Sequence, residues 1–453
     1  MNESDRVTIE KIVAGGVGLG RLDHGMVVLV PRVLPGEEVR FAGRRRHKSF
    51  LEADPVEILN PAPNRISPPC EYYQECGGCD LQHTDYPSQL IIKEGILREL
   101  LVRGKICDPD TIPHFLLPSV PSPDILSYRQ RLRLQVDENA RPGFYRCRSH
   151  EIVPVRRCLL AGSEINSILE LLHTDSAAAP LLAACESVEL LLNPRDSRVL
   201  LLFQLSGRET GPDLESGLKF CRGKETVQGM IFRGRGKGTG PYIINTAQGP
   251  VVSRNLAEEL RIRIPVSGEV AGRPFELTLE PGGFCQVNRR QNEKCMGILL
   301  DWAAAGLKET VLDLYCGMGN FSIPLAMKSG GVTGLDLEAS SIRSAARNAD
   351  LAGLSNCGFI RESALAGITR LAKEKNRFDL LLLDPPRAGC SEVIPHISGL
   401  GIRKILMVSC DPATLVRDLK LLQKSGYTIE RQHLVDMFPQ THHLETITLL
   451  SVN

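Results

Sequence analysis

The chain has 453 residues, and at roughly 150 residues per domain this length predicts two or three domains. An apolar content of 42%, a charged content of 24% and a formal charge of +1 are ordinary for a globular protein, so overall charge points to neither an RNA nor a membrane partner. The sequence has neither an apolar run of the roughly 18 residues that span a membrane nor the apolar segment of a signal peptide. We therefore expect a cytoplasmic protein.

Residues 7–59 alternate short apolar runs with turn signals such as Gly15-Gly16, which predicts a small antiparallel barrel. Residues 27–30 are expected to form one buried strand. The basic residues 44–48 would lie between two strands. A lone charge run is more often a solvated turn, but beside a barrel of the oligonucleotide-binding type it would follow phosphates. The prolines of residues 61–69 then indicate a domain boundary.

Cys70, Cys76 and Cys79 fall within ten residues, and Gly77-Gly78 would allow the sharp reversal that three ligands to one centre require. Fourteen cysteines in this chain are too few for a disulfide scaffold, and in a reducing compartment a cluster more often binds metal. Zinc sites usually take cysteines as two close pairs, whereas three plus one is common for iron–sulfur clusters. Cys158 is the best candidate for a fourth ligand because it follows the basic strands. The remaining cysteines, except one near the C-terminus, are expected to pack in the core.

Residues 81–105 have the apolar spacing of a helix that ends at Gly104 and that could pack on a catalytic domain. The apolar positions of this pattern are Leu90, Ile91, Ile96, Leu97, Leu100 and Leu101. From about residue 125 to 280 the chain is rich in predicted strands and turns. Its basic residues gather in the segments 129–133, 146–148, 156–157 and 233–237. Their density favours a polyanionic partner.

After about residue 280 strands and helices alternate, which predicts a doubly wound α/β domain. The expected strands lie near 311–315, 332–336, 358–361, 379–384, 404–409 and 444–452. A further extended stretch, 427–435, follows a helix at 413–424. The last two segments therefore predict a hairpin whose final strand is antiparallel to the others.

Three strand ends of this domain are suited to a nucleotide-like cofactor. Asp313 is expected to end a strand, and Gly317 and Gly319 would let a ligand approach the next helix. The third glycine of the dinucleotide fingerprint is missing, which makes pyrophosphate binding less favoured. Asp336 would accept hydrogen bonds from ribose hydroxyls, which both NAD and S-adenosylmethionine carry. Asp384 begins an acidic turn at the carboxyl edge of the sheet, and the three strand ends together favour S-adenosylmethionine.

A thiol and a carboxylate near the C-terminus could supply a nucleophile and a base. Cys410 ends an apolar strand and precedes Asp-Pro-Ala-Thr, and Glu445 lies 35 residues further on. An isolated cysteine at a strand end would be read as a core residue. The segment that follows Cys410 favours the nucleophile instead.

Taken in order, these segments resemble the RNA (uracil-5-)-methyltransferase family, most closely its iron–sulfur branch that methylates 23S ribosomal RNA. The resemblance covers nearly the whole chain and includes Phe-Cys-Gln-Val-Asn at 284–288. It implies an OB-like TRAM barrel that binds RNA over residues 1–60. It also implies a β-rich central iron–sulfur and RNA-binding domain over 61–279 and a Rossmann-like class I methyltransferase domain over 280–453.

The resemblance also implies roles for single residues. Contacts to S-adenosylmethionine are implied for Gln286, Tyr315, Asn320, Asp336 and Asp384. Ligands of a [4Fe-4S] cluster are implied for Cys70, Cys76, Cys79 and Cys158. Cys410 would add to C6 of uracil, and Glu445 would remove the C5 proton. Tyr315 and Asp336 stand where close relatives often have Phe and Glu.

Two alternatives to ribosomal RNA methylation stay open. One is the same reaction on transfer RNA, although the barrel and the cysteine cluster favour ribosomal RNA. The other is a non-catalytic RNA-binding or iron–sulfur sensor protein, and the presence of both Cys410 and Glu445 argues against it. The sequence indicates no obligate protein partner and does not identify the uridine.

Overall fold

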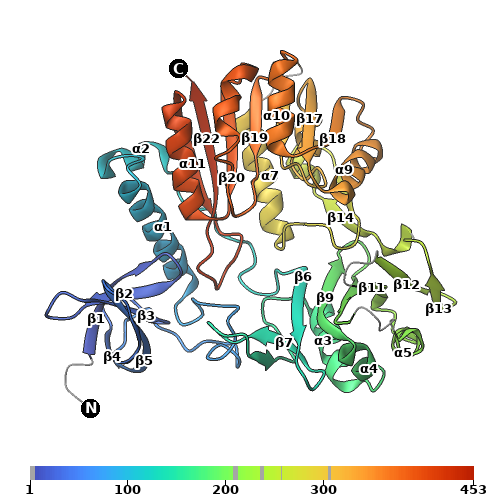
Figure 1. Ribbon diagram of the computed structural model, residues 1–453, viewed down its shortest axis with the longest axis horizontal. Coiled ribbons are helices and arrows are strands. Elements are labelled where there is room, and N and C mark those ends of the chain that lie inside the picture. Colours follow the sequence, from blue (N-terminus) through green and yellow to red (C-terminus); the bar gives the residue numbers. More distant parts are fainter. Residues whose placement is uncertain (1–5, 208–212, 235–238, 257, 305–307, 453) are drawn as a thin grey trace.

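The computed structural model describes residues 6–207, 213–234, 239–256, 258–304 and 308–452. Figure 1 shows a small barrel in blue, a β-rich central part in green, and a C-terminal sheet in yellow to red with helices on both faces. The barrel and the central part lie side by side below the C-terminal sheet in this view. Across these residues, none of the helices combines the length and the apolarity needed to cross a bilayer.

The N-terminal barrel closes in the strand order β1-β2-β3-β5-β4. Its strands are β1 (Arg6–Val13), β2 (Val17–Arg21), β3 (Val27–Pro31), β4 (Glu38–Arg46) and β5 (Phe50–Asn60). The pairs are antiparallel, as predicted, except for the parallel pair of β3 and β5. Gly20 is needed where β2 meets β1, since a Cβ there would lie 2.4 Å from the carbonyl oxygen of Thr8.

Two predictions for the barrel were only partly correct. Strand β3 is buried on one face alone: Val28 and Val30 are fully buried, while their neighbours are partly exposed. The alternation follows from the pleat of a strand that has solvent on one side. The arginines of segment 44–48 belong to β4 itself, and only His47 and Lys48 lie outside the strands. The long hairpin of β4 and β5 extends beyond the barrel core and carries these arginines into solvent.

The central part is an eight-stranded sheet in the order β13-β12-β11-β10-β9-β6-β7-β8. Its strands are β6 (Arg131–Val136), β7 (Pro142–Tyr145), β8 (Ile152–Pro154), β9 (Cys185–Asn193), β10 (Arg198–Leu205), β11 (Val227–Arg233), β12 (Thr239–Thr246) and β13 (Gly249–Ser253). Helices α3 (Ser163–Thr174), α4 (Ala178–Ala183) and α5 (Leu214–Cys221) pack on it and were not predicted. Helix α3 could have been predicted from the helical spacing of its buried apolar residues, which are Ile165, Ile168, Leu169 and Leu172. Residues 235–237 of the basic segment 233–237 lie outside the described residues.

The C-terminal sheet has seven strands in the order β18-β17-β16-β19-β20-β22-β21. They are β16 (Thr310–Leu314), β17 (Gly331–Asp336), β18 (Cys357–Arg361), β19 (Leu380–Leu383), β20 (Lys404–Ser409), β21 (Tyr427–Val435) and β22 (Glu445–Val452). The strands from β18 to β20 are parallel, and β22 is antiparallel to β20 and β21. The prediction of a doubly wound sheet with an antiparallel final hairpin is confirmed.

Helices cover both faces of this sheet. They are α7 (Arg289–Ala303), α8 (Ser322–Ala326), α9 (Ala339–Leu351), α10 (Ala364–Lys373) and α11 (Pro412–Lys424). Leu312 and Leu381 enter the core on one face, whereas Val311 and Leu380 enter the core on the other, as expected for parallel strands buried on both sides. The chain order reverses between β16 and β19, and ligands of such sheets bind at the carboxyl ends of the strands at this point.

Two further groups of elements connect these parts. The hairpin β14 (Ile262–Val266) and β15 (Phe275–Leu279), with the short helix α6 (Gly268–Ala271), leads from the central sheet into α7. Helices α1 (Tyr86–Arg103) and α2 (Ile112–Phe115) lead from the barrel to the edge of the C-terminal sheet (Figure 1).

The helix predicted over 81–105 is confirmed as α1, with a later start. Asp85 accepts a hydrogen bond from the Ser88 amide, and Pro87 occupies the first turn, so the helix begins at Tyr86. Its C-cap is Gly104, as predicted. Leu97 and Leu101 join the apolar core that includes Leu415 of α11, so α1 packs on the C-terminal part.

Candidate active site

The strand pairing of β20 with β22 brings Cys410 and Glu445 together at the carboxyl edge of the sheet. Cys410 directly follows β20, and Glu445 is the first residue of β22. Ser409 is paired with Thr446, so the next position outward along the two strands is Cys410 beside Glu445. Asp411 caps α11 by accepting hydrogen bonds from the amides of Ala413 and Thr414 at 3.0 and 2.9 Å. The cap holds the half-buried thiol between strand and helix.

The carboxyl groups near the Cys410 thiol are not balanced by ion pairs with basic side chains of the described residues. Burial raises the pKa of Cys410 to about 11, helped by the charges of Glu445 and Asp384, while Arg387 opposes the shift. Burial and Asp384 raise the pKa of Glu445 well above its usual value, and burial raises that of Asp384 to about 7. Among the described residues no ion pair includes either carboxyl. A cation bound here would be favoured.

The first testable consequence is slow alkylation of Cys410. Below a pKa of about 11 the thiolate fraction is small, so the reaction of Cys410 with iodoacetamide should speed up about tenfold per pH unit between about pH 7 and pH 9. Asp384→Asn removes one of the charges that oppose the thiolate and should accelerate the reaction. Mass spectrometry of the Cys410 peptide measures both. Asp350→Asn, an exposed carboxylate on α9, is the control, and a rate independent of pH would contradict the raised pKa.

Asp336 and the glycine turn lie against each other at the neighbouring strand ends. The Asp336 carboxylate accepts hydrogen bonds from the amide of Gly317 at 3.0 Å and from the amide of Glu338 at 2.8 Å. Tyr315, Gly317 and Gly319 have φ values of +67°, +56° and +81°, so the chain turns here in the left-handed region that suits glycine. The turn fixes the orientation of the carboxylate.

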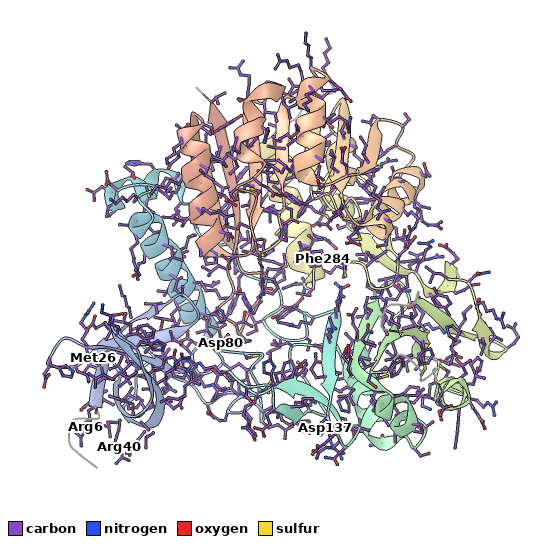
Figure 2. The ribbon with its side chains drawn as sticks, in the orientation of Figure 1. Arg6, Met26, Arg40, Asp80, Asp137 and Phe284 are labelled. Atoms are coloured by element: carbon purple, nitrogen blue, oxygen red, sulfur yellow. The ribbon has the colours of Figure 1, made fainter. Side chains whose placement is uncertain are left out.

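Asn320 follows the glycine turn, and Gln286 precedes α7, the helix that Asn320 contacts. The side-chain amides of Asn320 and Asn292 on α7 exchange two hydrogen bonds of 2.8 and 3.0 Å. Gln286 lies, partly exposed, on the segment between β15 and α7. Figure 2 shows its neighbour Phe284 between the C-terminal sheet and the central part, and this ring is 65% exposed. The fold therefore brings the start of α7 against the residue that follows the glycine turn.

Asp313 lies near the candidate site, and the sequence analysis identified it only as a strand end. Strand β16 continues to Leu314, so Asp313 is an internal residue of the strand. It is buried, one carboxyl oxygen accepts a hydrogen bond from the Ser322 hydroxyl, and the other, Oδ1, has no partner among the described residues. Burial raises its pKa to about 8, with further contributions from Asp384 and Asp336. These couplings place Asp313 between the glycine turn and the Asp384 turn.

The four cysteines predicted to bind a cluster line one cavity. Cys70, Cys76, Cys79 and Cys158 share a cavity of about 350 Å³. Burial raises the pKa of each thiol, that of Cys76 to about 11. Gly77 leaves little room for a side chain beside them, because a Cβ would lie 3.1 Å from the Cα atom of Cys147.

The spacing of these thiols does not match a single metal ion. Within the described part of the chain, no three candidate ligands lie close enough together to hold one ion. A four-iron cluster sits between its thiolates and spreads them further apart than the ligands of one ion. The four half-buried thiols that line this cavity agree in number with the ligands of such a cluster.

The loop of residues 436–444, which we call the 436–444 loop, connects the cysteine cavity with the candidate base. It joins β21 to β22 and ends directly before Glu445. His443 lines the cysteine cavity, and His442 Nδ1 lies 2.6 Å from the Asp80 carboxylate, one residue after Cys79. The sequence pattern of the loop did not reveal these contacts, because their partners lie in the N-terminal quarter of the chain.

Comparison with known proteins agrees with this site. The model of the tRNA (Uracil-5-)-methyltransferase family matches residues 262–453. Over 98% of its length the chain is 31% identical to the 23S rRNA (uracil(1939)-C(5))-methyltransferase RlmD of Aeromonas hydrophila, of which it covers 95%. The chain belongs to the RNA (uracil-5-)-methyltransferase family. The enzyme of the same name from Vibrio campbellii is 32% identical over 98% of this chain and 95% of its own length.

A solved structure shows that the family fold extends over the whole chain. The Pyrococcus abyssi tRNA (uracil-54, C5)-methyltransferase, solved in complex with S-adenosyl-L-homocysteine, superposes with a TM-score of 0.71 and 24% identity. The match covers 99% of this chain and 100% of that one. The predicted fold class of this RNA (uracil-5-)-methyltransferase family member, a barrel, a β-rich centre and a Rossmann-like domain, is confirmed.

Proposed function

We propose that this protein transfers the methyl group of S-adenosylmethionine to C5 of a uridine in 23S ribosomal RNA. The observation that carries the proposal is the pairing of Cys410 with Glu445 at the carboxyl edge of the sheet, next to the Asp384 turn and the glycine turn. Ribosomal RNA is favoured because the relatives that match over nearly the full length are named as 23S rRNA enzymes.

The order of chemical steps follows from the poor nucleophilicity of C5. Cys410 adds as a thiolate to C6, forming an S–C6 bond and moving electron density to C5 as an enolate. When bound, S-adenosylmethionine supplies the electrophilic methyl group and leaves as S-adenosylhomocysteine. Glu445 then removes the C5 proton, the C5–C6 double bond re-forms, and the thiolate of Cys410 departs.

The electrostatics of the site support an order of binding. Burial, helped by the charges of Glu445 and Asp384, raises the pKa of the Cys410 thiol to about 11, so little thiolate is present at neutral pH. The positive charge of the sulfonium would offset these carboxylates and lower that pKa. We therefore infer that the methyl donor binds before Cys410 attacks the base. Gln286, Tyr315, Asn320, Asp336 and Asp384 are the residues proposed to contact it.

Replacing Asp336 with alanine should weaken the binding of S-adenosylmethionine by about 1.5 to 3 kcal/mol, the usual range for hydrogen bonds to a charged group. The carboxylate ends β17 beside the glycine turn and keeps lone pairs free for ribose hydroxyls. Isothermal calorimetry measures the change, with Asp350→Ala as an exposed control on α9. Unchanged affinity in a folded Asp336→Ala variant would reject the assignment.

Two exposed features support an RNA substrate. The ring of Phe284 lies open to solvent beside the candidate site, where it could stack on an unpaired base. On the barrel, Arg44 and His47 contact Glu52, whereas no ion pair of the described residues includes Arg45, Arg46 or Lys48. These three charges remain available for phosphates.

A methylation assay with unmodified RNA tests the substrate class. The protein is incubated with methyl-labelled S-adenosylmethionine and with either 23S ribosomal RNA or transfer RNA transcripts, and the nucleosides are then separated. We expect labelled 5-methyluridine in the ribosomal RNA. If only the transfer RNA is labelled, transfer RNA and not 23S ribosomal RNA is the substrate. The absence of 5-methyluridine from both RNAs would reject the proposed function.

We further propose that Cys70, Cys76, Cys79 and Cys158 hold a [4Fe-4S] cluster, because their half-buried thiols line one cavity. Protein purified without oxygen should be brown, and Cys158→Ala should lose most of its iron. The control is Cys107→Ala, because Cys107 is a partly exposed cysteine that does not line the cavity, and this variant should keep its iron. Metal analysis that found stoichiometric zinc and no iron would contradict the proposal. Full iron content in Cys158→Ala would also contradict it.

A further inference from the structure

The 436–444 loop determines from one side where Glu445 lies. Strand pairing places the backbone of Glu445 opposite Val435. The chain enters β22 from the loop, so a shift of the loop moves the first residue of the strand. Strand ends move more easily than strand centres, because fewer ladder hydrogen bonds hold them. The position of the proposed base therefore depends on the anchors of the loop.

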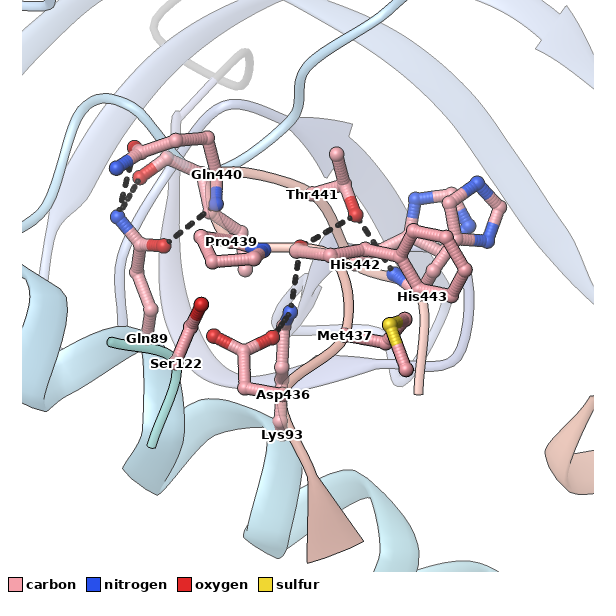
Figure 3. Close-up of polar contacts among 12 residues, drawn as sticks. Gln89, Lys93, Ser122, Asp436, Met437, Pro439, Gln440, Thr441, His442 and His443 are labelled. Atoms are coloured by element: carbon pink, nitrogen blue, oxygen red, sulfur yellow. Dashed lines mark hydrogen bonds and ion pairs between the residues drawn. The ribbon is translucent and has the colours of Figure 1, made fainter. Parts of the chain in front are cut away.

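The first anchor is Lys93 of α1, a lysine that is fully buried. Its Nζ atom donates to the Asp436 carboxylate at 2.6 Å and to the carbonyl oxygen of Phe438 at 3.0 Å. Figure 3 shows Lys93 extending from the helix to Asp436. Both side chains of this pair are 0% exposed. A buried ion pair has a large desolvation cost, so it is weak as a source of stability and better explained by a positional role.

The second anchor is Gln89, one helical turn before Lys93 on the same face. Its amide nitrogen donates to the Gln440 side-chain oxygen at 3.0 Å, and its oxygen accepts from the Gln440 backbone amide at 2.9 Å. The amides of Asp80 and Leu81 both donate to the Gln440 carbonyl oxygen at 3.0 Å. Figure 3 shows the paired amide side chains of Gln89 and Gln440.

Gln440 has a backbone conformation that needs these contacts. Its φ of +70° is in the left-handed region, which is unfavourable for residues other than glycine. Such strain, of order 1 to 3 kcal/mol, persists only where the surroundings over-determine it, and it concentrates at functional sites. The strained turn lies five residues before Glu445. Its geometry is imposed by α1 and the segment at 80–81, both far from the catalytic domain in sequence.

We propose that Lys93 and Gln89 are positioning residues for Glu445: they hold the 436–444 loop in the geometry that brings the carboxyl to the C5 proton. The inference rests on the role of Glu445 under the proposed function. Addition of Cys410 to C6 and methyl transfer both precede proton removal. Loosening the loop should therefore slow the last step and leave the first two nearly intact.

The test follows the covalent enzyme–RNA adduct in the full-length protein. Lys93→Met should accumulate the methylated adduct, with its resolution slowed on the order of 10²-fold, the effect of about 1 Å of misplacement. The affinity for S-adenosylmethionine should not change. Glu99→Gln is the matched control on the same helix, because Glu99 pairs with Lys11 of the barrel and not with the loop. It should resolve the adduct at the native rate.

Two further variants separate positioning from folding. Lys93→Met leaves the Asp436 carboxyl buried without its partner, which alone could unfold the protein. Lys93→Met/Asp436→Asn removes that charge, so its melting temperature should return towards the native value while the adduct still persists. Gln89→Leu leaves no buried charge and should also slow adduct resolution. Adduct resolution at the native rate in both folded variants would overturn the inference. It would also be overturned if C6 addition, methyl transfer and adduct resolution were all slowed equally in these variants.

The variant Glu445→Gln, measured in parallel, separates a failure of the proposed role of Glu445 from a failure of the positioning inference. If it forms no trapped adduct, the proposed role of Glu445 fails. If it traps the adduct whereas the Lys93 and Gln89 variants do not, Glu445 keeps its role and only the positioning inference fails. A trapped adduct in Glu445→Gln and in the Lys93 and Gln89 variants supports both the role of Glu445 and the positioning inference.

Discussion

Replacing Cys410 with alanine should abolish methylation and leave no covalent enzyme–RNA species. Without a nucleophile at C6 the uracil ring has no route to the C5 enolate, so every later step is blocked. We expect the rate to fall by roughly 10⁴-fold or more, as when nucleophiles of other covalent enzymes are removed. A denaturing gel of labelled RNA and nucleoside analysis for 5-methyluridine measure the two effects separately.

Cys295 offers a matched control for that experiment. It is a buried thiol of α7. Burial raises its pKa, and the charges of Glu445 and Asp384 raise it further, as they do for Cys410, so it lies near the same carboxyls. Cys295→Ala should retain most of the activity and the transient adduct. An adduct of unchanged yield in Cys410→Ala would remove Cys410 from the role of nucleophile.

Replacing Glu445 with glutamine should trap a methylated covalent adduct. The variant keeps the shape of the side chain, so Cys410 can still add to C6 and C5 can still accept the methyl group. The C5 proton then has no base, and the thiolate cannot leave. With doubly labelled RNA and S-adenosylmethionine, a slowly migrating band should carry both labels. Glu430→Gln on β21, an exposed carboxylate, is the control and should turn over normally.

The raised pKa of Glu445 gives this prediction a pH dependence. The base must be ionised to accept the proton, and burial holds its pKa well above the usual value, so the ionised fraction at neutral pH is reduced. Adduct resolution in the native protein should therefore speed up as pH rises through neutrality. Normal turnover by Glu445→Gln at any pH would remove Glu445 from the role of base.

Local patterns determined much of this protein. The alternation of apolar runs and turns predicted the doubly wound class of the C-terminal domain, since strands that alternate with helices form parallel sheets with short, right-handed connections. The close spacing of Cys70, Cys76 and Cys79 was readable because three thiols within ten residues are near each other in any fold. The pairing of Cys410 with Glu445 was not predicted, because the hairpin expected from the last two segments pairs β21 with β22, whereas these two residues meet across β20 and β22.

Helix α1 shows what local patterns could not determine. Its apolar spacing predicted the helix correctly but not the face that it buries: Ile91 is 70% exposed, while Lys93 and Gln89 are buried. The helix packs on the C-terminal sheet, the barrel and the 436–444 loop at once, so its buried surface is not a single apolar stripe. A lysine is almost never fully buried unless it is paired.

The partners of these two buried side chains lie 343 and 351 residues further along the chain. The sequence by itself therefore predicted which residues could perform the chemistry, since the proposed nucleophile, the proposed base and the glycine turn are each a local segment at a strand end. Only the tertiary structure decided which side chains contact the loop that precedes Glu445. Contacts over such separations depend on how three parts of the chain pack together, and no local spacing or propensity records that packing.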